Sequence, residues 1–528
     1  MTAHYTHRQI LKIMTGLLMA LLTSMISTSV VSTALPTIVG DLGGQDQLAW
    51  VASAALLTMT ASTPLWGKLS DLFGRKLMFQ TALIVFVAGS IAAGLSQNIG
   101  WLIAARAVQG LGTGGLSALT QVILGDIVEP RERGRYSGFV GAVFGVSTVA
   151  GPLLGGFIVD TSWLGWRWCF YVCVPLAIIA SIVIQRVLKL PRRGVATGEE
   201  QARRESSVDW FGAFTITGAA ATVMLLLSLA GKEFAWDSPW TYGLAGLSLV
   251  LLALAVVAER TAAEPILPPR LFGDRTFALT ALASLFVGVS LFGVLIFLPQ
   301  YLQIVKGMRP TASGLMTLPL VLGLFVASTL SGRFVTKTGR WKIFPALGML
   351  CVAIGLALLT RLHVGSGKFV IGLDIAVVGV GLGLSMQILI LAAQNASAHR
   401  DLAATTSGVS FFRNLGGAVG VAAFGAILTS RLSSGMADRL RAAHLQVKGG
   451  GSGLGSPEAV QHLPGPVKDI VIASFTDAMH MVFLVGVPVA VAGFLAVLAL
   501  KELPLRSAPV ERFPAETPTG PETSVTMK

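Results

Sequence analysis

Fourteen stretches of roughly 20 apolar residues recur along the 528-residue chain, and this pattern limits its fold more than any other feature. A membrane-spanning helix needs about 20 apolar residues, and a helix satisfies its backbone polar groups internally. Charged residues make up 12% of the chain, against about 25% in soluble domains. We therefore expect an all-α, multi-pass membrane protein. The stretches are 12–35, 49–66, 77–96, 100–125, 137–158, 166–185, 210–230, 240–258, 276–298, 311–331, 343–360, 369–392, 407–429 and 473–500.

The net charge is +13. The basic residues are concentrated in alternate loops between the apolar stretches, so the charge does not indicate a nucleic-acid-binding surface. If the N-terminus is cytoplasmic, most Lys and Arg residues fall on inner loops, and the first two outer loops carry none. Cytoplasmic loops are enriched in Lys and Arg, and an even number of spans returns the chain to its starting side. We therefore expect both termini in the cytoplasm. Segment 430–472 is an exception with five basic residues, but long loops cross the membrane largely regardless of charge.

Several familiar classes are excluded by what the chain lacks. No phosphate-binding G-x-x-x-x-G-K-[ST] loop, zinc-protease motif or serine-hydrolase motif is present, so we expect no enzyme, no cofactor and no metal site. A G-x-G-x-x-G pattern begins at Gly110, but it lies inside an apolar stretch, so we interpret it as helix packing. The first apolar stretch resembles a signal peptide but is too long for one, so we interpret it as the first span.

The segment Gly138–Gly156 combines Pro152 with several glycines inside one apolar stretch, among them Gly141, Gly145, Gly151, Gly155 and Gly156. Glycine and proline weaken a helix, and a spanning helix tolerates them where neighbouring helices compensate. Glycines also let another helix approach closely, and proline kinks or stiffens the helix. The segment is typical either of a moving transporter helix or of a tightly packed, kinked span with no role in transport.

Two halves of the chain repeat each other. The basic turn Gly67–Lys76 reappears as Gly332–Lys342, 265 residues later, and Gly110–Gly114 has a counterpart at Gly379–Gly383. Internal repeats in a multi-pass chain indicate a two-bundle transporter that rocks around a central site. The expected units are a six-helix bundle (1–187), a basic cytoplasmic linker (188–209), two inserted helices (210–258), a second linker (259–275), a second six-helix bundle (276–502) with an outer loop (430–472), and a disordered cytoplasmic tail (503–528).

These motifs resemble the major facilitator superfamily. The run Gly67–Lys76 resembles its G-x-L-x-D-x-x-G-R-[KR] signature, and Arg106–Gly110 resembles its fourth-helix motif. Gly151–Gly156 (G-P-L-L-G-G) resembles the antiporter motif of its drug exporters, with Gly151, Pro152, Gly155 and Gly156 as the matching positions. Fourteen spans with two between the halves resemble its 14-span drug:proton antiporter branch, most of all actinobacterial exporters. The resemblance implies a bacterial plasma membrane protein that exports drugs or antibiotic-like metabolites.

The resemblance also implies a cytoplasmic charge latch that holds one access state. Its residues in this chain are Asp71, Arg75, Asp126 and Arg131. The alternative is a solvated inner surface that only sets topology. In the second half Thr336 stands where Asp71 would align, so we expect a weaker latch there, or none.

The residues expected to couple transport to protons depart from the family's pattern in the first span. Arg106 lies inside a span, where an arginine costs about 2.5–3.5 kcal/mol, so it should face the interior, and the resemblance links it to proton movement. The family's first-span acid is replaced by Ser27, which does not titrate in this pH range. Asp374 is the replacement we propose, because burial raises the pKa of an isolated acid. Each residue has a purely structural alternative.

Polar and aromatic groups within or near the spans are candidates for the walls of a substrate cavity. A flat, largely apolar molecule would be oriented there by a few hydrogen bonds. The same groups could instead form hydrogen bonds between helices. The candidates are Ser24, Ser27, Thr28, Gln121, Gln300, Gln387, Gln394, Asn395, Asn414 and Phe411.

The sequence therefore predicts a monomeric, proton-driven exporter of small amphipathic organic compounds. A metabolite uniporter or proton symporter of the same fold is the alternative, since the first-span acid is missing. A non-transporting membrane sensor or scaffold is a remote alternative, because no soluble signalling domain is evident.

Overall fold

The computed structural model describes residues 7–42, 48–128, 130–161, 163–188, 209–230, 234–262, 265–443, 460 and 463–505. All fourteen apolar stretches are largely helical, although 166–185 and 311–331 are each divided between two helices. Ten helical segments among the described residues are long and apolar enough to cross a membrane. Within the described residues the β-structure is one isolated bridge between Ala230 and Phe234. The expected all-α fold class is confirmed, whereas the linker 189–208 and the tail 506–528 lie outside the described residues.

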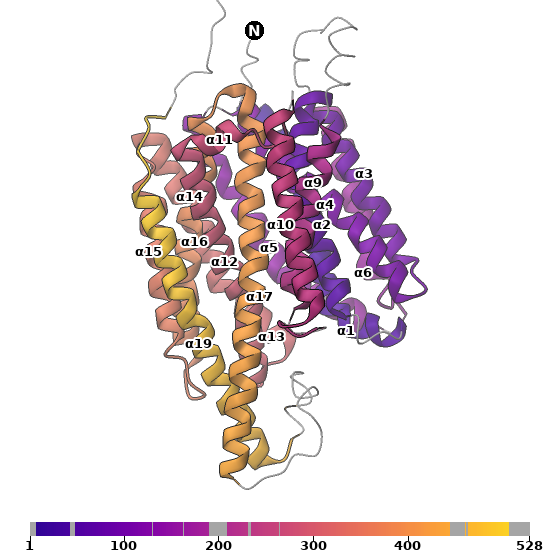
Figure 1. Ribbon diagram of the computed structural model, residues 1–528, viewed down its shortest axis with the longest axis vertical. Coiled ribbons are helices and arrows are strands. Elements are labelled where there is room, and N and C mark those ends of the chain that lie inside the picture. The colour runs from indigo at the N-terminus through magenta and orange to yellow at the C-terminus, as the bar shows by residue number, and fades with distance from the viewer. Residues whose placement is uncertain are drawn as a thin grey trace, which may run out of the picture.

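The first half is a bundle of helices, the last of which is broken into two (Figure 1). Helix α4 packs between α2 and α3, and α1 packs on α5 and α7. A Cβ atom at Gly110 would lie 2.2 Å from Ala55 O, and one at Gly112 would lie 2.4 Å from Phe86 N. These glycines therefore allow α4 to touch the backbones of its neighbours. The helices are α1 (His7–Leu42), α2 (Leu48–Phe73), α3 (Arg75–Gly94), α4 (Ile99–Ile127), α5 (Pro130–Asp160), α6 (Trp168–Tyr171) and α7 (Cys173–Val187).

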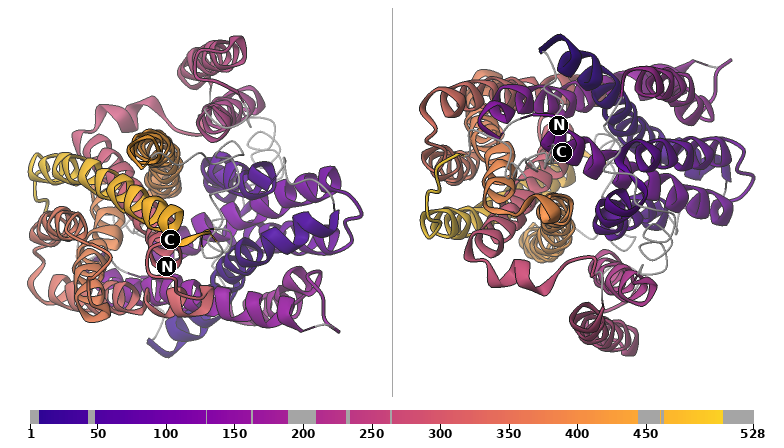
Figure 2. Two further views of the ribbon diagram at one scale, coloured as in Figure 1. Left: turned by 90° about the horizontal axis from the view of Figure 1, so that it is seen from below. Right: turned by 90° about the horizontal axis from the view of Figure 1, so that it is seen from above.

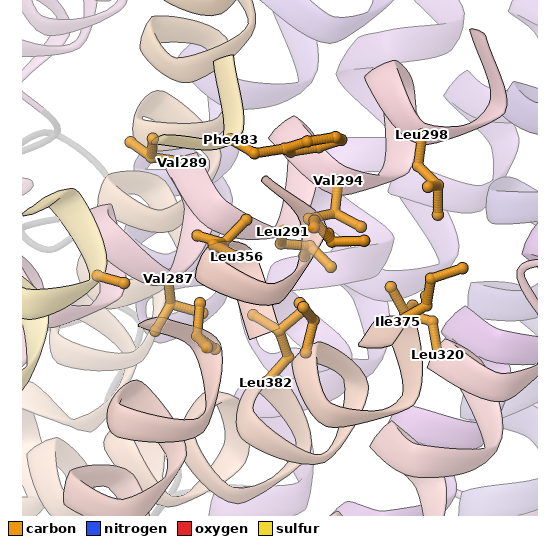
Figure 3. Close-up of a cluster of buried hydrophobic side chains, with 14 of the residues drawn as sticks. Val287, Val289, Leu291, Val294, Leu298, Leu320, Leu356, Ile375, Leu382 and Phe483 are labelled. Atoms are coloured by element: carbon orange, nitrogen blue, oxygen red, sulfur yellow. The ribbon is translucent and has the colours of Figure 1, made fainter. Parts of the chain in front are cut away.

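The second half repeats this arrangement around its own apolar core. Val287 and Leu291 of α12, Leu356 of α15, Leu382 of α16 and Phe483 of α19 meet in this core (Figure 3). The helices are α12 (Arg275–Ile304), α13 (Pro310–Leu315), α14 (Leu318–Thr338), α15 (Ile343–Leu359), α16 (Lys368–Ala396), η2 (His399–Asp401), α17 (Leu402–Ala442) and α19 (Gly465–Leu498).

Two helices inserted between the halves lie at the periphery of the bundle (Figure 2). Helix α9 (Trp210–Leu229) packs on α2 and α17, whereas α10 (Pro239–Thr261) packs mainly on α9. The short α11 (Pro269–Gly273) leads from this pair to α12. Large apolar side chains of α10, such as Trp240 and Leu249, are exposed, as expected of a lipid-facing surface.

The inner end of the bundle is defined here as the end that carries the two basic turns. His7 Nδ1 lies 2.5 Å from Tyr136 Oη near the start of α5, and Glu502 reaches the α14–α15 turn, so both ends of the described chain lie there. Helix α17 extends past the bundle at the opposite, outer end (Figure 1). The expected outer loop 430–472 therefore begins as helix, because Arg439 donates a 2.8 Å hydrogen bond to Ser474 Oγ of α19 and stabilises the extension.

Candidate functional site

Three of the four expected latch residues meet at the inner end of the first half. Arg75 Nη2 lies 2.7 Å from Asp71 Oδ1, and Arg75 Nε lies 2.7 Å from Asp126 Oδ2. Gly74, between α2 and α3, has φ 92°, a positive value that favours glycine. The chain reverses direction at this residue, so Arg75 at the start of α3 lies beside Asp71 of α2. The cluster joins α2, α3 and α4 within one half. Arg131 is the second residue of α5, but its side chain lies outside the described part.

Arg133, two residues further along, connects the two halves. Its side chain is buried, with Nε donating to Val128 O (2.9 Å), Nη1 to Gln394 Oε1 (3.0 Å) and Nη2 to Gly125 O. Burial lowers the pKa of Arg133, and the negative charge of Asp126 partly offsets this effect. The resulting pKa is about 10, so the guanidinium is protonated at neutral pH. The sequence interpretation counted Arg133 only as one of the positive inner charges.

Several expected cavity amides lie where the halves touch near the inner end. Gln121 Nε2 of α4 donates to Gln387 Oε1 of α16 at 3.3 Å, and Gln394 Nε2 donates to Thr406 Oγ1 at 2.9 Å. A Cβ at Gly67 would lie 2.4 Å from Ser407 Oγ, so α2 and α17 also touch closely here. In this state the amides of Gln121, Gln387 and Gln394 belong to a contact between the halves.

The other cavity candidates are scattered. Ser24 of α1 is buried and donates a hydrogen bond to Leu21 O (2.9 Å) within the same helix. Thr28, one helical turn later in α1, is exposed. Gln300 is exposed at the outer end of α12, and Asn395 Nδ2 donates to Pro504 O (3.1 Å) at the inner end.

Phe411 and Asn414 lie on α17 of the second half. Phe411 packs with Ala61 of α2 and Ala220 of α9. Asn414 is buried, and its Nδ2 has no hydrogen-bond partner among the residues that the structure describes. Phe411 therefore helps to attach the inserted pair to both halves, while the amide of Asn414 has capacity for a further hydrogen bond.

Arg106 belongs to a buried polar network in the first half that is centred on Gln109. Arg106 Nη1 donates to Gln109 Oε1 (2.5 Å), and Gln109 Nε2 donates to Ser27 Oγ (2.9 Å) and Ser90 Oγ (2.8 Å). All four side chains are at most 3% exposed. The sequence interpretation missed Gln109, although its spacing of three residues from Arg106 places both side chains on one helix face.

Asp374 lies apart from this network. It is 7% exposed, in the first two turns of α16 at the outer end. Val378 and Gly381, four and seven residues later, pack against Gly355 and Gly348 of α15, so Asp374 lies on the α15 side of its helix. The charged group that acts on it is Arg361. The structure therefore does not bring together the two expected proton-coupling residues.

The Gly-Pro segment packs α5 tightly against both α1 and α14. A Cβ at Gly151 would lie 2.1 Å from Ser29 Oγ, and one at Gly145 would lie 2.1 Å from Val321 Cγ1 of the second half. A Cβ at Gly155 would lie 2.9 Å from Val30 O, whereas nothing lies within 4 Å of one at Gly156. Pro152 stays inside the continuous helix and faces Gly314 of α13.

Replacing Gly151 with alanine is expected to lower stability by about 1–3 kcal/mol, because the new methyl group forces α1 and α5 apart. Thermal unfolding in detergent would measure this loss. Gly156→Ala is the matched control in the same motif and should unfold at or above the wild-type temperature. Equal losses in the two variants would contradict the packing argument.

The second basic turn is held by the C-terminal segment. Glu502 Oε1 accepts hydrogen bonds from the backbone N–H groups of Trp341 (2.9 Å) and Lys342 (3.3 Å), and Trp341 Nε1 donates to Leu503 O (2.9 Å). This carboxylate lies at the start of α15, where a negative charge is favourable. A depression of about 370 Å³ beside it is lined by Thr338, Gly339, Arg340, Glu502, Pro504 and Leu505, none of them an expected cavity residue.

Two similar helical halves that meet across buried polar contacts are the architecture of many membrane transporters. The sequence profile described as Major Facilitator Superfamily matches residues 17–421, so the chain belongs to that superfamily.

Relatives and solved structures agree with this assignment. The chain is 34% identical to the Multidrug transporter protein MdtP of Bacillus subtilis, over 94% of each chain. It is 31% identical to Multidrug resistance protein 3 of the same species, over 90% of this chain and 92% of the relative. The proton:xylose symporter XylE has the same fold, with a TM-score of 0.56, 17% identity and coverage of 94% of this chain and 95% of the symporter.

Proposed function

We propose that this protein is a secondary active exporter of amphipathic drugs or antibiotic-like metabolites, working by proton antiport and alternating access in a bacterial cell membrane. The observation that carries the proposal is the similarity to relatives named as multidrug transporters and efflux pumps, over more than nine-tenths of the chain. The protein takes up protons from outside as substrate leaves, and each charge that crosses 100 mV supplies about 2.3 kcal/mol.

The contacts at the inner end support alternating access. Arg133–Gln394 and Gln121–Gln387 join the first half to the second there. Toward the outer end, α1 exposes Thr28 and Ser32 on one face, four residues apart. In our proposal this state is closed to the cytoplasm, and transport breaks the inner contacts.

Arg106 and Asp374 are the proposed proton-coupling residues. The guanidinium of Arg106 acts through its charge, and the carboxyl of Asp374 is the group that gains and loses the proton. A metabolite uniporter or symporter is the second candidate, because Ser27 occupies the position of the expected first-span acid and no proton can bind there near neutral pH.

The test is dye transport by inside-out vesicles with and without a pH gradient. The antiporter proposal expects accumulation that collapses when the gradient is dissipated. Asp374→Asn is expected to retain downhill dye movement and lose gradient-driven accumulation. Asp237→Asn, at an exposed position outside the spans, is the matched control. Transport that ignores the gradient would favour a uniporter, and normal coupling in Asp374→Asn would remove Asp374 from the proton path.

A further inference from the structure

The buried charges of this protein are unevenly compensated. Arg75 pairs with Asp126, Asp401 with Arg270, Arg133 donates to carbonyl groups, and Glu259 accepts from the N–H groups of Ile266 and Leu267. Two buried arginines differ: no carboxylate among the described residues lies within ion-pair distance of Arg106 or Arg413. Both lie well inside their helices, α4 and α17.

Arg106 is surrounded by neutral polar groups. The hydrogen bond to Gln109 uses one of its five N–H groups, and its Nε has no hydrogen-bond partner among the described residues. Gln109 is fixed in turn by Ser27 and Ser90, both neutral. The guanidinium is therefore held in place but keeps its charge and free donors.

A buried arginine without a counter-charge is unfavourable in a membrane unless something compensates it. Carboxylates and sulfonates are suitable partners, since a guanidinium binds such groups through two parallel hydrogen bonds. Arg413, which has no hydrogen bond to any residue in the described ranges, adds a second positive charge to the bundle interior. The buried acid that remains, Asp374, lies toward α15 and Arg361.

We infer that the exported compounds are amphipathic organic anions, and that their acidic group pairs with Arg106. The inference rests on the proposed exporter function and names its substrate class. Ser27 itself is buried, but the next residue of α1, Thr28, is exposed. The Arg106 network therefore ends one residue away from an exposed polar position of α1, and the proposed substrate approaches Arg106 from that side. A cation would be repelled by Arg106, and the second uncompensated arginine, Arg413, adds to the positive charge inside the bundle.

The test compares two amphipathic dyes of opposite charge in proteoliposomes: anilinonaphthalene sulfonate, a monovalent anion, and ethidium, a monovalent cation. Wild-type protein should export the sulfonate in preference to ethidium. A potential negative on the cytoplasmic face should accelerate sulfonate export, because exchange of an anion for a proton moves two charges in the favourable sense. Exchange of ethidium for one proton is electroneutral and should not respond.

The variant Ser27→Asp supplies an internal counter-charge. Its carboxylate would lie beside Gln109 and neutralise Arg106, so the ratio of sulfonate to ethidium transport should fall by about tenfold or more. Ser27→Asn has nearly the same shape without the charge. Any effect of its altered packing should slow both dyes alike, so their ratio should be unchanged.

The outcomes separate the two proposals. If wild-type protein prefers ethidium and Ser27→Asp leaves the ratio unchanged, the anion inference is wrong while the exporter function stands. If wild-type protein moves neither dye against its gradient and the sulfonate does not quench its tryptophan fluorescence, both proposals fail.

Discussion

Replacing Arg75 with glutamine is expected to destabilise the protein by about 3–5 kcal/mol, the typical effect of removing one partner from a buried ion pair. Arg75 is 7% exposed and serves two carboxylates, Asp71 and Asp126, which are 16% and 12% exposed. Without the guanidinium, two partly buried negative charges face each other across the α2–α4 contact. Thermal unfolding of the purified protein in detergent would measure the loss.

Arg340→Gln is the control for this prediction. Arg340 occupies the matching basic turn of the second half, but it is exposed. Its replacement should shift the unfolding temperature by little, as exposed charges usually contribute less than about 1 kcal/mol. A similar shift in both variants would show that the Arg75 cluster is only a solvated surface, which was the alternative drawn from the sequence.

The fold could be predicted because it depends on a pattern that is local and repeated. Fourteen apolar stretches of the right length leave little choice but helices, and the repeat of Gly67–Lys76 at Gly332–Lys342 indicates two halves. The helix ends were harder: α17 continues to Ala442 because it packs against α19, a contact that no local signal marks.

The positions of the site residues could be predicted only where the geometry of a single helix determines them. Arg133 contacts Gln394 of the second half, but two positions along a helix are a rotation of roughly 200°, so composition cannot tell which basic residue of this turn does so. Asp374 was chosen for its chemistry, but the packing of Val378 and Gly381 places its face toward α15. The contact from Glu502 to Trp341 spans 161 residues and depends on tertiary structure alone.

The basic turns at the inner ends of the two halves are bound by carboxylates from different parts of the chain. In the first half Asp71 and Asp126 neutralise the basic turn through Arg75. In the second half, where Thr336 replaces the aspartate, the carboxylate comes from Glu502 of the C-terminal segment and binds backbone N–H groups. Asn395 also donates to Pro504 O, next to Gln394, the residue that Arg133 contacts. The C-terminal segment therefore binds the residue next to Gln394, which forms the contact between the halves.

Replacing Arg133 with glutamine is expected to shift the protein toward a state open at the inner end. A hydrogen bond to a charged group contributes about 1.5–3 kcal/mol, so its loss changes the ratio of the two states by roughly 10- to 100-fold. Arg133→Lys keeps the charge but lacks the planar fork that reaches Gly125, Val128 and Gln394 together, so it should shift the ratio in the same direction.

Spin-label distances at both ends would measure this shift, after replacement of Cys169, Cys173 and Cys351. Leu77 and Phe334 are exposed near the inner end of the two halves, and Leu95 and Val364 near the outer end. In Arg133→Gln the distance between the labels of the inner pair should increase and that of the outer pair should decrease. Two rigid halves that rock about a central site close at one end when they open at the other. If the inner distance grows while the outer distance stays fixed, Arg133 only ties down the start of α5, and the contact with Gln394 does not control access.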